Sequence, residues 1–410
     1  MGPLSTTAFL IASALKVVVI FTVVMLTVAG VTLAERKGAA WIQDRSGPNR
    51  VGPWGLLQPI ADGLKNFLKE ENLPAAASKL LFHLAPLISL FPALVLFAVI
   101  PVAAPLPTRW GLVEMIIADL PVGFLYIIAL ASLGVYGLVL GGWASNSKYA
   151  FLGGLRASAQ MISYEVALGL SLVPILMLSG NVALPNIIHQ QQDIGLWFIF
   201  PLLLGFVFFI VSGLAETNRL PFDMPEAESE LVAGYHAEYS AMKFAMFFLA
   251  EYANVFTSCA LMVTFFFGGW DIPFWKGDNM AVTADGTVVG ATPAWWITLL
   301  TAGVFYLKSL ALVGVFIWVR WTLPRFRYDQ IMSLGWKVLI PLLVGYITLL
   351  GGTIVALEEI GIEFGMTYGL VLTALNVVLL FALLFGVDRS RVIAGAGWRP
   401  TRPRPVQTRR

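Results

Sequence analysis

Long apolar stretches separated by polar segments dominate the pattern of this sequence. An α-helix needs about 20 consecutive apolar residues to cross the hydrocarbon core of a membrane. Such stretches lie near residues 9–34, 80–104, 119–141, 157–180, 194–215, 241–269, 295–320, 335–357 and 367–386. Their apolar residues are continuous, as from Phe200 to Val211, whereas strands of a membrane barrel would alternate. The pattern therefore predicts an all-α polytopic membrane protein with about nine spans, in which residues 1–386 form a single transmembrane domain.

The composition agrees with a chain whose main solvent is lipid. Hydrophobic residues make up 58% of the chain and charged residues only 12%, against roughly 25% charged in an average soluble domain. The first apolar stretch contains Lys16, is followed by Glu35-Arg36-Lys37 and shows no small-residue cleavage site. We interpret it as a retained membrane span rather than as a signal peptide.

Redox cofactors have no support in the sequence. The single cysteine, Cys259, excludes a disulfide within the chain and an iron–sulfur cluster held by its own thiolates. The three histidines, His83, His189 and His236, are too far apart in sequence to show metal-ligand spacing. Glycine-rich nucleotide-binding loops are also absent. We therefore expect no metal, flavin or iron–sulfur cluster in this chain.

The basic residues predict which way the chain crosses the membrane. The segments after the first, third, fifth, seventh and ninth spans hold 21 of the 26 Lys and Arg residues, whereas the opposite side holds Arg109 and Lys276. Positive charge is enriched on the cytoplasmic side, so the N-terminus is expected outside and the C-terminus inside. The basic, proline-rich tail at residues 387–410 then lies beside anionic lipid, and we expect it to bind no nucleic acid.

Three ionisable residues stand inside predicted spans, which is costly. Glu165, Glu251 and Lys308 each have apolar neighbours, and a charge at the centre of a bilayer costs at least about 2.5 to 3.5 kcal/mol. The functional interpretation is that they take part in proton coupling. The alternative is that they pair with each other or with the backbone and only fix the helix register, since buried ions are weak stabilisers.

The segment from Glu216 to Glu251 is unusually acidic for a predicted cytoplasmic loop. Seven acids against the two bases Arg219 and Lys243 give a net charge of −5 in a chain whose total is +2. An acidic docking surface for a basic partner is one interpretation. Phe222 and the neighbouring prolines instead favour a folded, partly buried loop at residues 216–240, whose carboxylates titrate as a coupled set. The seven acids are Glu216, Asp223, Glu226, Glu228, Glu230, Glu238 and Glu251.

The first predicted cytoplasmic segment, residues 35–79, has a different character. Glu35-Arg36-Lys37 is followed by a turn rich in Gly and Pro that contains Arg45. After the turn, Leu56, Leu57, Ile60, Leu64, Phe67 and Leu68 fall on one helical face. This spacing predicts an amphipathic helix that lies in the membrane interface. A helix in this position could form the lower wall of an entrance for a lipid-soluble substrate.

Several of these segments together resemble the H-subunit family of bacterial NADH-quinone oxidoreductase, respiratory complex I, whose mitochondrial counterpart is membrane subunit 1. The stretches that carry the resemblance are Glu35-Arg36-Lys37 with residues 43–53, Ser163-Tyr164-Glu165-Val166, residues 215–219 continuing through 225–231, Ala250-Glu251-Tyr252, and residues 324–330. The likeness runs from about residue 30 to residue 385. The basic tail after Asp388 and an outer loop from Asp271 to Pro293 depart from the family pattern.

The resemblance implies a subunit that forms much of a quinone chamber and starts a chain of carboxylates for proton translocation. The residues expected at the chamber are Arg36, Arg45, Glu216, Arg219, Phe222, Asp223, Glu226, Glu228 and Glu230. Those expected in proton coupling are Glu165, Glu216, Glu238, Glu251 and Lys308. Quinone would be the substrate, and electrons would come from other chains.

The implied partners are the iron–sulfur and quinone-site subunits of the peripheral arm and the small and antiporter-like membrane subunits, all at the bacterial plasma membrane. Two alternatives remain open from the sequence. One is the equivalent subunit of a related complex fed by another electron donor, such as reduced deazaflavin or hydrogen. The other is a free-standing proton or cation transporter, although transporters commonly show internal repeats and the halves of this chain show none that is clear.

Overall fold

The computed structural model describes residues 6–225, 228–273, 275–282, 288–290, 292, 294–362 and 364–387. Glu226 and the basic tail beyond residue 387 lie outside these residues. Within the described part, the regular secondary structure is helical, apart from two short hairpins formed by β1 (Leu106–Thr108) with β2 (Gly111–Val113) and by β3 (Met280–Val282) with β4 (Val288–Gly290).

Eight helical segments in the described residues are long and apolar enough to cross a membrane, which confirms the predicted all-α polytopic class. They are α1 (Thr6–Ile42), α3 (Lys79–Val95) with its continuation Leu96–Val99, α4 (Gly123–Ala144), α5 (Lys148–Ser179), α9 (Ala241–Phe266), α10 (Trp295–Thr322), the segment Tyr328–Glu359 and α13 (Met366–Val387). The segment Tyr328–Glu359 combines α11 (Tyr328–Ser333), a π-helical turn (Leu334–Leu339) and α12 (Ile340–Glu359). The predicted orientation of the termini stays a prediction.

The fifth predicted span differs from the others. Its helix, α7 (Leu203–Glu216), has 14 residues and is about 21 Å long, shorter than the roughly 30 Å of a hydrocarbon core. Proline disfavours helical backbone in the residue before it, and Pro201 stands just ahead of α7. The preceding residues form turns instead, and the Ile199 N–H donates to the Phe266 carbonyl at 2.8 Å. The apolar stretch alone did not reveal this interruption.

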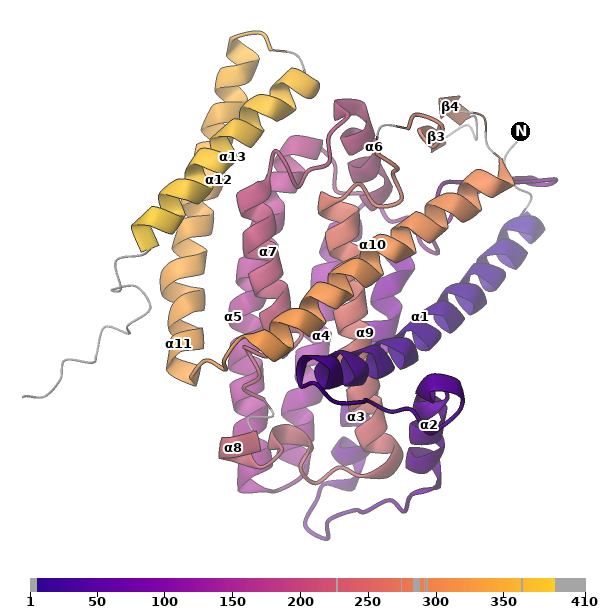
Figure 1. Cartoon of the computed structure of the whole chain (residues 1–410), viewed down its shortest axis with the longest axis vertical. Helices are drawn as coiled ribbons and strands as arrows, with labels where there is room; N and C mark the ends of the chain where they lie inside the picture. Colours follow the sequence, from indigo (N-terminus) through magenta and orange to yellow (C-terminus); the bar gives the residue numbers. More distant parts are fainter. Residues whose placement is uncertain are drawn as a thin grey trace, which may run out of the picture.

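Among the eight long segments, α9 is the most buried, and it packs against α1, α3, α7 and α10. In Figure 1, α3, α4, α5, α7 and α9 form the centre of the molecule, α1 and α10 cross it obliquely, and α12 and α13 stand to one side. Small residues allow the close approach, as membrane helices commonly require. A Cβ added at Gly142 of α4 would lie 2.5 Å from the carbonyl oxygen of Ala150 in α5.

The helix α1 continues beyond the point where the sequence predicted its span to end. It runs through Glu35, Arg36 and Lys37 to Ile42, and its 37 residues give a length of about 55 Å. Glu35 therefore lies inside a helix and is buried, rather than at the start of a loop. In Figure 1 the helix runs obliquely to the central helices, and tilting is one way in which a helix longer than the hydrocarbon core fits a membrane.

The amphipathic helix expected after the first span is present as α2 (Gln58–Leu68), preceded by a short 3₁₀ turn (Pro53–Gly55). Its apolar residues, Ile60, Leu64, Phe67 and Leu68, are all exposed on the isolated chain. A helix with one exposed apolar face fits the membrane interface. Its location there stays a prediction.

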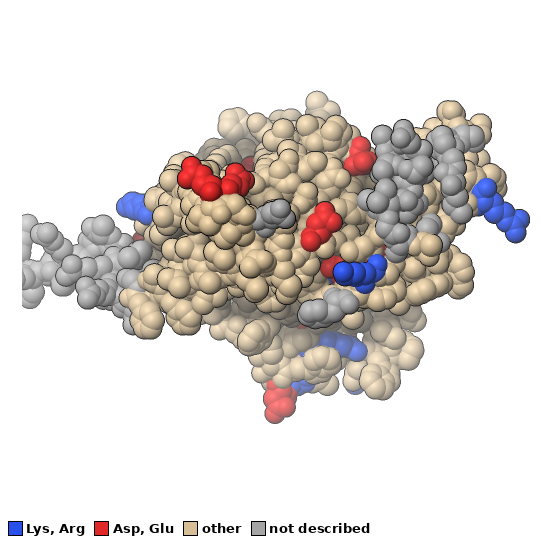
Figure 2. Space-filling view, turned by 90° about the horizontal axis from the view of Figure 1, so that it is seen from above, with Lys and Arg blue, Asp and Glu red and all other residues tan. Residues whose placement is uncertain are grey.

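The remaining short helices lie in the connections. They are α6 (Leu184–Ile194), α8 (Glu228–Leu231) and a 3₁₀ turn (Gly234–His236). Viewed from the end that carries α6 and the β3–β4 hairpin, acidic and basic side chains are scattered among uncharged residues (Figure 2). That end therefore presents dispersed charge of both signs.

Candidate functional site

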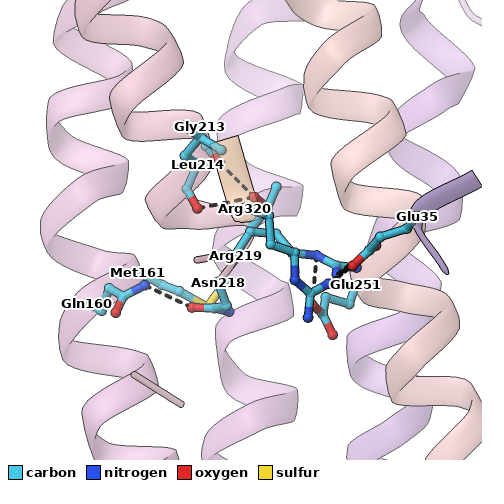
Figure 3. A network of polar contacts seen from close by, with 10 residues as sticks. Glu35, Gln160, Met161, Gly213, Leu214, Asn218, Arg219, Glu251 and Arg320 are labelled. Atoms are coloured by element: carbon cyan, nitrogen blue, oxygen red, sulfur yellow. Dashed lines mark hydrogen bonds and ion pairs between the residues drawn. The ribbon is translucent and has the colours of Figure 1, made fainter. Parts of the chain in front are cut away.

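Four charged side chains from four different segments meet at the centre of the structure. Arg219, in the loop after α7, donates from Nη1 to Glu35 Oε2 of α1 at 3.2 Å, and its Nε lies 2.9 Å from Glu251 Oε1 of α9. Arg320 of α10 also pairs with Glu35. Figure 3 shows Arg219 between the two carboxylates, with Arg320 beside it. We call these four residues the central ion cluster.

The central ion cluster is shielded from solvent. The side chains of Arg219 and Glu35 are only 5% and 8% exposed, and that of Glu251 is 14% exposed. The guanidinium of Arg219 also lies over the ring of Tyr252, 4.1 Å from its centre. Charges buried in this way cost free energy unless each has partners, and two arginines against two carboxylates leave the cluster neutral in sum.

The loop that places Arg219 is fixed by Gln160 of α5. The Gln160 Nε2 donates to the carbonyl oxygens of Ala215 and Phe222, both at 2.7 Å. It also donates to Asn218 Oδ1 at 3.1 Å (Figure 3). Asn218 has a positive φ of 52°, which turns the chain sharply after α7. Backbone carbonyls bonded to a buried amide hold the loop in one conformation, so Arg219 has a defined position.

An open cavity lies against one side of the central ion cluster. Its volume is about 370 Å³ and its walls include Glu35, Arg36, Arg45, Tyr252 and Trp321. Small-molecule sites usually have volumes of about 300 to 1,000 Å³, apolar walls and a few polar groups. The structure thus brings the predicted residues Arg36 and Arg45 together in one cavity. We call it the basic chamber.

Two smaller cavities lie on the other side and contain the predicted carboxylates. One, of about 50 Å³, is lined by Glu165 and Glu216, and the other, of about 30 Å³, is lined by Glu216 and Glu251. Glu216, Thr217 and Asn254 belong to the walls of both. The two therefore adjoin, and the order along them is Glu165, Glu216, Glu251. We call the pair the carboxylate cavities.

The other acids of the predicted loop are not in the carboxylate cavities. Asp223 is buried and pairs with Arg325 at 2.6 Å, whereas Glu230 is exposed and pairs with Arg156 at 2.6 Å. Glu238 is half-buried before α9 and is not among the residues lining these cavities, and Glu228 begins α8. The acids predicted as one coupled set are therefore divided among separate environments.

Phe222 packs inside the protein next to the same loop. Its ring lies 5.5 Å from that of Tyr164 and 5.6 Å from that of Phe326, measured between ring centres. It is 3% exposed and is not among the residues that line the basic chamber. The structure assigns it to the core that supports the loop, and its predicted contact with a substrate stays untested.

Lys308 lies apart from the carboxylates. Its Nζ donates to the carbonyl oxygens of Phe267, Gly269 and Asp271 at 2.8, 3.2 and 2.6 Å, and it lies 4.2 Å from the ring centre of Trp197. These carbonyls follow the C-terminal end of α9, and Glu251 lies about 24 Å away along that helix. A cation at a helix C-terminus is electrostatically favourable. The structure therefore gives Lys308 a different setting from the one predicted for proton coupling.

Some residues of the site were not predicted from the sequence. Glu35 and Arg320 complete the central ion cluster, Ser132 of α4 donates a hydrogen bond to Glu165, and Asn254 lines both carboxylate cavities. Glu35 was visible as an acid next to Arg36, yet it was assigned to the end of a span. The sequence around Ser132 is uncharged and gives no such indication, whereas Asn254 lies one helical turn after Glu251, a signal that could have identified it.

The side chains that commonly bind metals are dispersed. In the part of the chain that the structure describes, no three residues among His, Cys, Asp and Glu lie together in a way that could hold a metal ion. Cys259 is buried in α9 as a free thiol. The polar groups that the described residues place at the cavities are carboxylates, guanidinium groups, hydroxyls and amides.

The fold and the site together define an all-α polytopic membrane protein with an open basic chamber next to buried acidic groups. A family model described as NADH dehydrogenase matches residues 15–351. The chain belongs to this NADH dehydrogenase family.

Individual relatives agree over most of their length. The chain is 48% identical to NADH-ubiquinone oxidoreductase chain 1 of Chondrus crispus over 348 residues, which cover 85% of this chain and 98% of the relative. It is 51% identical to an NADH-quinone oxidoreductase H subunit of Geobacter metallireducens over 327 residues, covering 80% and 92%. With the NADH-quinone oxidoreductase H subunit of Paramagnetospirillum magneticum the identity is 47% over 342 residues, covering 83% and 92%.

Proposed function

We propose that the chain is the membrane subunit of a proton-pumping NADH-quinone oxidoreductase and that it couples quinone reduction to proton movement through buried carboxylates. Its relatives bear the names of NADH-quinone and NADH-ubiquinone oxidoreductase subunits and match it over most of their length. The NADH-oxidising and electron-carrying groups belong to partner subunits in this proposal. The chain supplies part of the quinone site and the first proton-accepting groups in the membrane.

The observation that carries the proposal is the position of Arg219. Its guanidinium contacts Glu35, which lines the basic chamber, and Glu251, which lines a carboxylate cavity. Only the side chain of Arg219 therefore separates the wall of the basic chamber from Glu251, a group that can bind a proton. At an effective dielectric constant of 20, two unit charges about 4 Å apart interact by about 4 kcal/mol.

The proposed sequence of events follows from charge balance. Reduction of a quinone to a quinol takes two electrons, supplied by a partner subunit, and two protons. If the electrons arrive before the protons, the reduced quinone carries negative charge beside Arg36 and Arg45. This negative charge competes with Glu35 for the nearby arginines. Arg219 and Arg320 then pair partly with the new charge and less with the carboxylates. Glu251 takes up a proton because its pairing with Arg219 weakens. Glu216 and Glu165 pass the proton further along the carboxylate cavities.

The test is Glu216→Gln in the intact complex. Glutamine keeps the shape and polarity of the side chain but carries no titratable proton, so quinone reduction and proton translocation should fall together while assembly persists. Glu358→Gln, at the exposed end of α12, is the matched control and should leave both activities unchanged. Normal coupled turnover of the Glu216→Gln complex would overturn the proposal. Failure of that complex to assemble would instead show that Glu216 has a structural role.

The electron donor is decided by a separate experiment. We expect the complex purified in mild detergent through this chain to contain iron–sulfur subunits and to reduce quinone with NADH. Reduction of quinone by hydrogen or reduced deazaflavin, but not by NADH, would place the chain in a related complex. Purification of the chain without partners, together with ion flux in liposomes, would favour the transporter alternative.

A further inference from the structure

Buried hydroxyl groups in the membrane helices fall into two kinds. Thr264, Thr301 and Ser309 each donate to the carbonyl oxygen four residues earlier, at 2.8 to 2.9 Å. This is the usual way in which a hydroxyl is satisfied inside a helix. Ser89, Thr257 and Ser258, and also Ser212, have no hydrogen-bond partner among the described residues although they are buried.

Three of these four unpartnered hydroxyls share one location. Ser89 of α3 and Thr257 and Ser258 of α9 all line the cavity that contains Glu165 and Glu216, and they are 5%, 2% and 8% exposed. Ser89 also lines the adjoining cavity with Glu251. A buried hydroxyl without a partner costs about 1 to 3 kcal/mol, so a group of three at one cavity requires an explanation.

Water is the ligand that fits these hydroxyls. A water molecule needs a space of about 10 to 15 Å³, measured for the centre of a water-sized sphere, and two or more polar partners. The cavity offers about 50 Å³ on this measure, with hydroxyl, carboxylate and amide groups in its walls. It therefore has room for about three water molecules.

We infer that Ser89, Thr257 and Ser258 hold a row of water molecules between Glu165 and Glu216, and that they are positioning residues for proton exchange between these carboxylates. This inference rests on the proposed function and deepens it. A hydroxyl both donates and accepts, so it can orient a water molecule without removing it from the row. The row also provides a path for a proton between carboxylates on two different helices, α5 and α7.

The proposed transfer is balanced at every step. Protonated Glu216 gives its proton to the nearest water as that water gives one of its own protons to the next molecule. The last water protonates the carboxylate of Glu165, so each water ends with two protons and one proton has moved. The direction reverses when Glu165 is the protonated partner. The hydroxyls need not change their own protonation state.

The experiment is Thr257→Val in the intact complex, compared with Thr264→Val. Valine has the shape of threonine without the hydroxyl, and Thr264 lies two turns further along α9 with its hydroxyl already bonded to Ala260. We expect Thr257→Val to slow coupled quinone reduction about fivefold, the effect of losing one hydrogen bond to an ordered water, with an unchanged KM for quinone. The solvent deuterium isotope effect on turnover should rise, because proton transfer becomes slower relative to the other steps.

The hydroxyl itself is tested by Thr257→Ser, which should restore most of the rate and the original isotope effect. Equal effects of Thr257→Val and Thr264→Val, or no rescue by serine, would overturn the inference, because they would indicate packing instead of water binding. Full activity of Thr257→Val with an inactive Glu216→Gln complex would also overturn it and leave the proposed function in place. Full activity in both complexes would remove the proposed function as well.

Discussion

Arg219 Nε lies 2.9 Å from Glu251 Oε1, and the same guanidinium donates to Glu35 from its Nη1. This arrangement places one arginine between a carboxylate at the wall of the basic chamber and a carboxylate at the wall of a smaller cavity. Glu35 and Arg219 are 184 residues apart in the sequence, so their pairing depends on the packing of α1 against the loop after α7. The two sides of the site are therefore electrostatically linked through a single side chain.

The first prediction concerns the stability that this arginine provides. Arg219→Met removes a positive partner from the buried carboxylates of Glu35 and Glu251. Removing one partner of a buried ion pair lowers the stability by about 3 to 5 kcal/mol. The purified complex should lose this subunit at a clearly lower temperature than the native complex. Arg156→Met is the control, since the exposed pair of Arg156 with Glu230 contributes at most about 1 kcal/mol. Similar losses in the two variants would contradict the central role of Arg219.

The second prediction concerns the basic chamber. Arg45 lies in its wall and is exposed on the isolated chain, so its guanidinium is available to a quinone carbonyl. A hydrogen bond from a charged donor contributes about 1.5 to 3 kcal/mol, so Arg45→Ala should raise the KM for a short-chain quinone at least about tenfold. Arg50→Ala, an exposed arginine that is not among the residues lining the chamber, should leave the KM unchanged. An unchanged KM in Arg45→Ala would remove Arg45 from the proposed quinone site.

Much of the fold could be predicted from the sequence because one physical rule governs it. Lipid cannot satisfy backbone polar groups, so long apolar stretches must become helices, and the eight long segments lie where the apolar stretches are. The cost of placing a charge in lipid likewise identified Glu165 and Glu251, since an acidic residue among apolar neighbours can be recognised from the sequence alone. The short helix α7 was missed because the turns before Leu203 have their backbone groups bonded to other segments, such as the Phe266 carbonyl.

The connections within the site could not be predicted in this way. The pairing of Arg320 with Glu35 joins residues 285 positions apart, and Arg320 in sequence resembles any basic residue at the end of a span. Lys308 shows the opposite problem. Its apolar neighbours predicted either a role in proton coupling or a pairing with the backbone, and its contacts are three backbone carbonyls from a loop 37 to 41 residues earlier in the chain. Pattern locates unusual residues, whereas tertiary packing decides their partners.

The third prediction tests the setting of Lys308. Lys308→Met removes three hydrogen bonds to the carbonyls that follow α9, and charge-assisted hydrogen bonds contribute about 1.5 to 3 kcal/mol each. We expect less assembled complex and a lower dissociation temperature, with a normal ratio of protons translocated to quinone reduced in the complex that remains. Lys276→Met, an exposed lysine in the same connection, is the control and should assemble normally. A stable Lys308→Met complex with a reduced proton ratio would favour the proton-coupling role predicted from the sequence.

The fourth prediction concerns pH and rests on Asp278, in the connection between α9 and α10. Asp278 is fully buried, its Oδ2 accepts a hydrogen bond from the Ile272 N–H at 2.8 Å, and its surroundings include Asp271 and Lys308. Burial, reinforced by the nearby Asp271 carboxylate, raises the pKa of Asp278 to about 6. Because the folded state holds this proton more tightly than the unfolded state does, the contribution to stability is complete at low pH. It is lost as the pH rises through about 6.

Asp278→Asn should therefore flatten the dependence of stability on pH between about 4 and 7, since asparagine is uncharged throughout this range and its Oδ1 can still accept from Ile272. At pH values above the pKa of Asp278, the variant should dissociate at a higher temperature than the native complex. Asp193→Asn, at an exposed carboxylate of α6, provides the control and should leave the profile as it is. Thermal dissociation of the purified complex across this pH range measures the difference. A profile that stays as steep in Asp278→Asn as in the native complex would mean that other groups titrate there, because an asparagine at this position has no proton to lose.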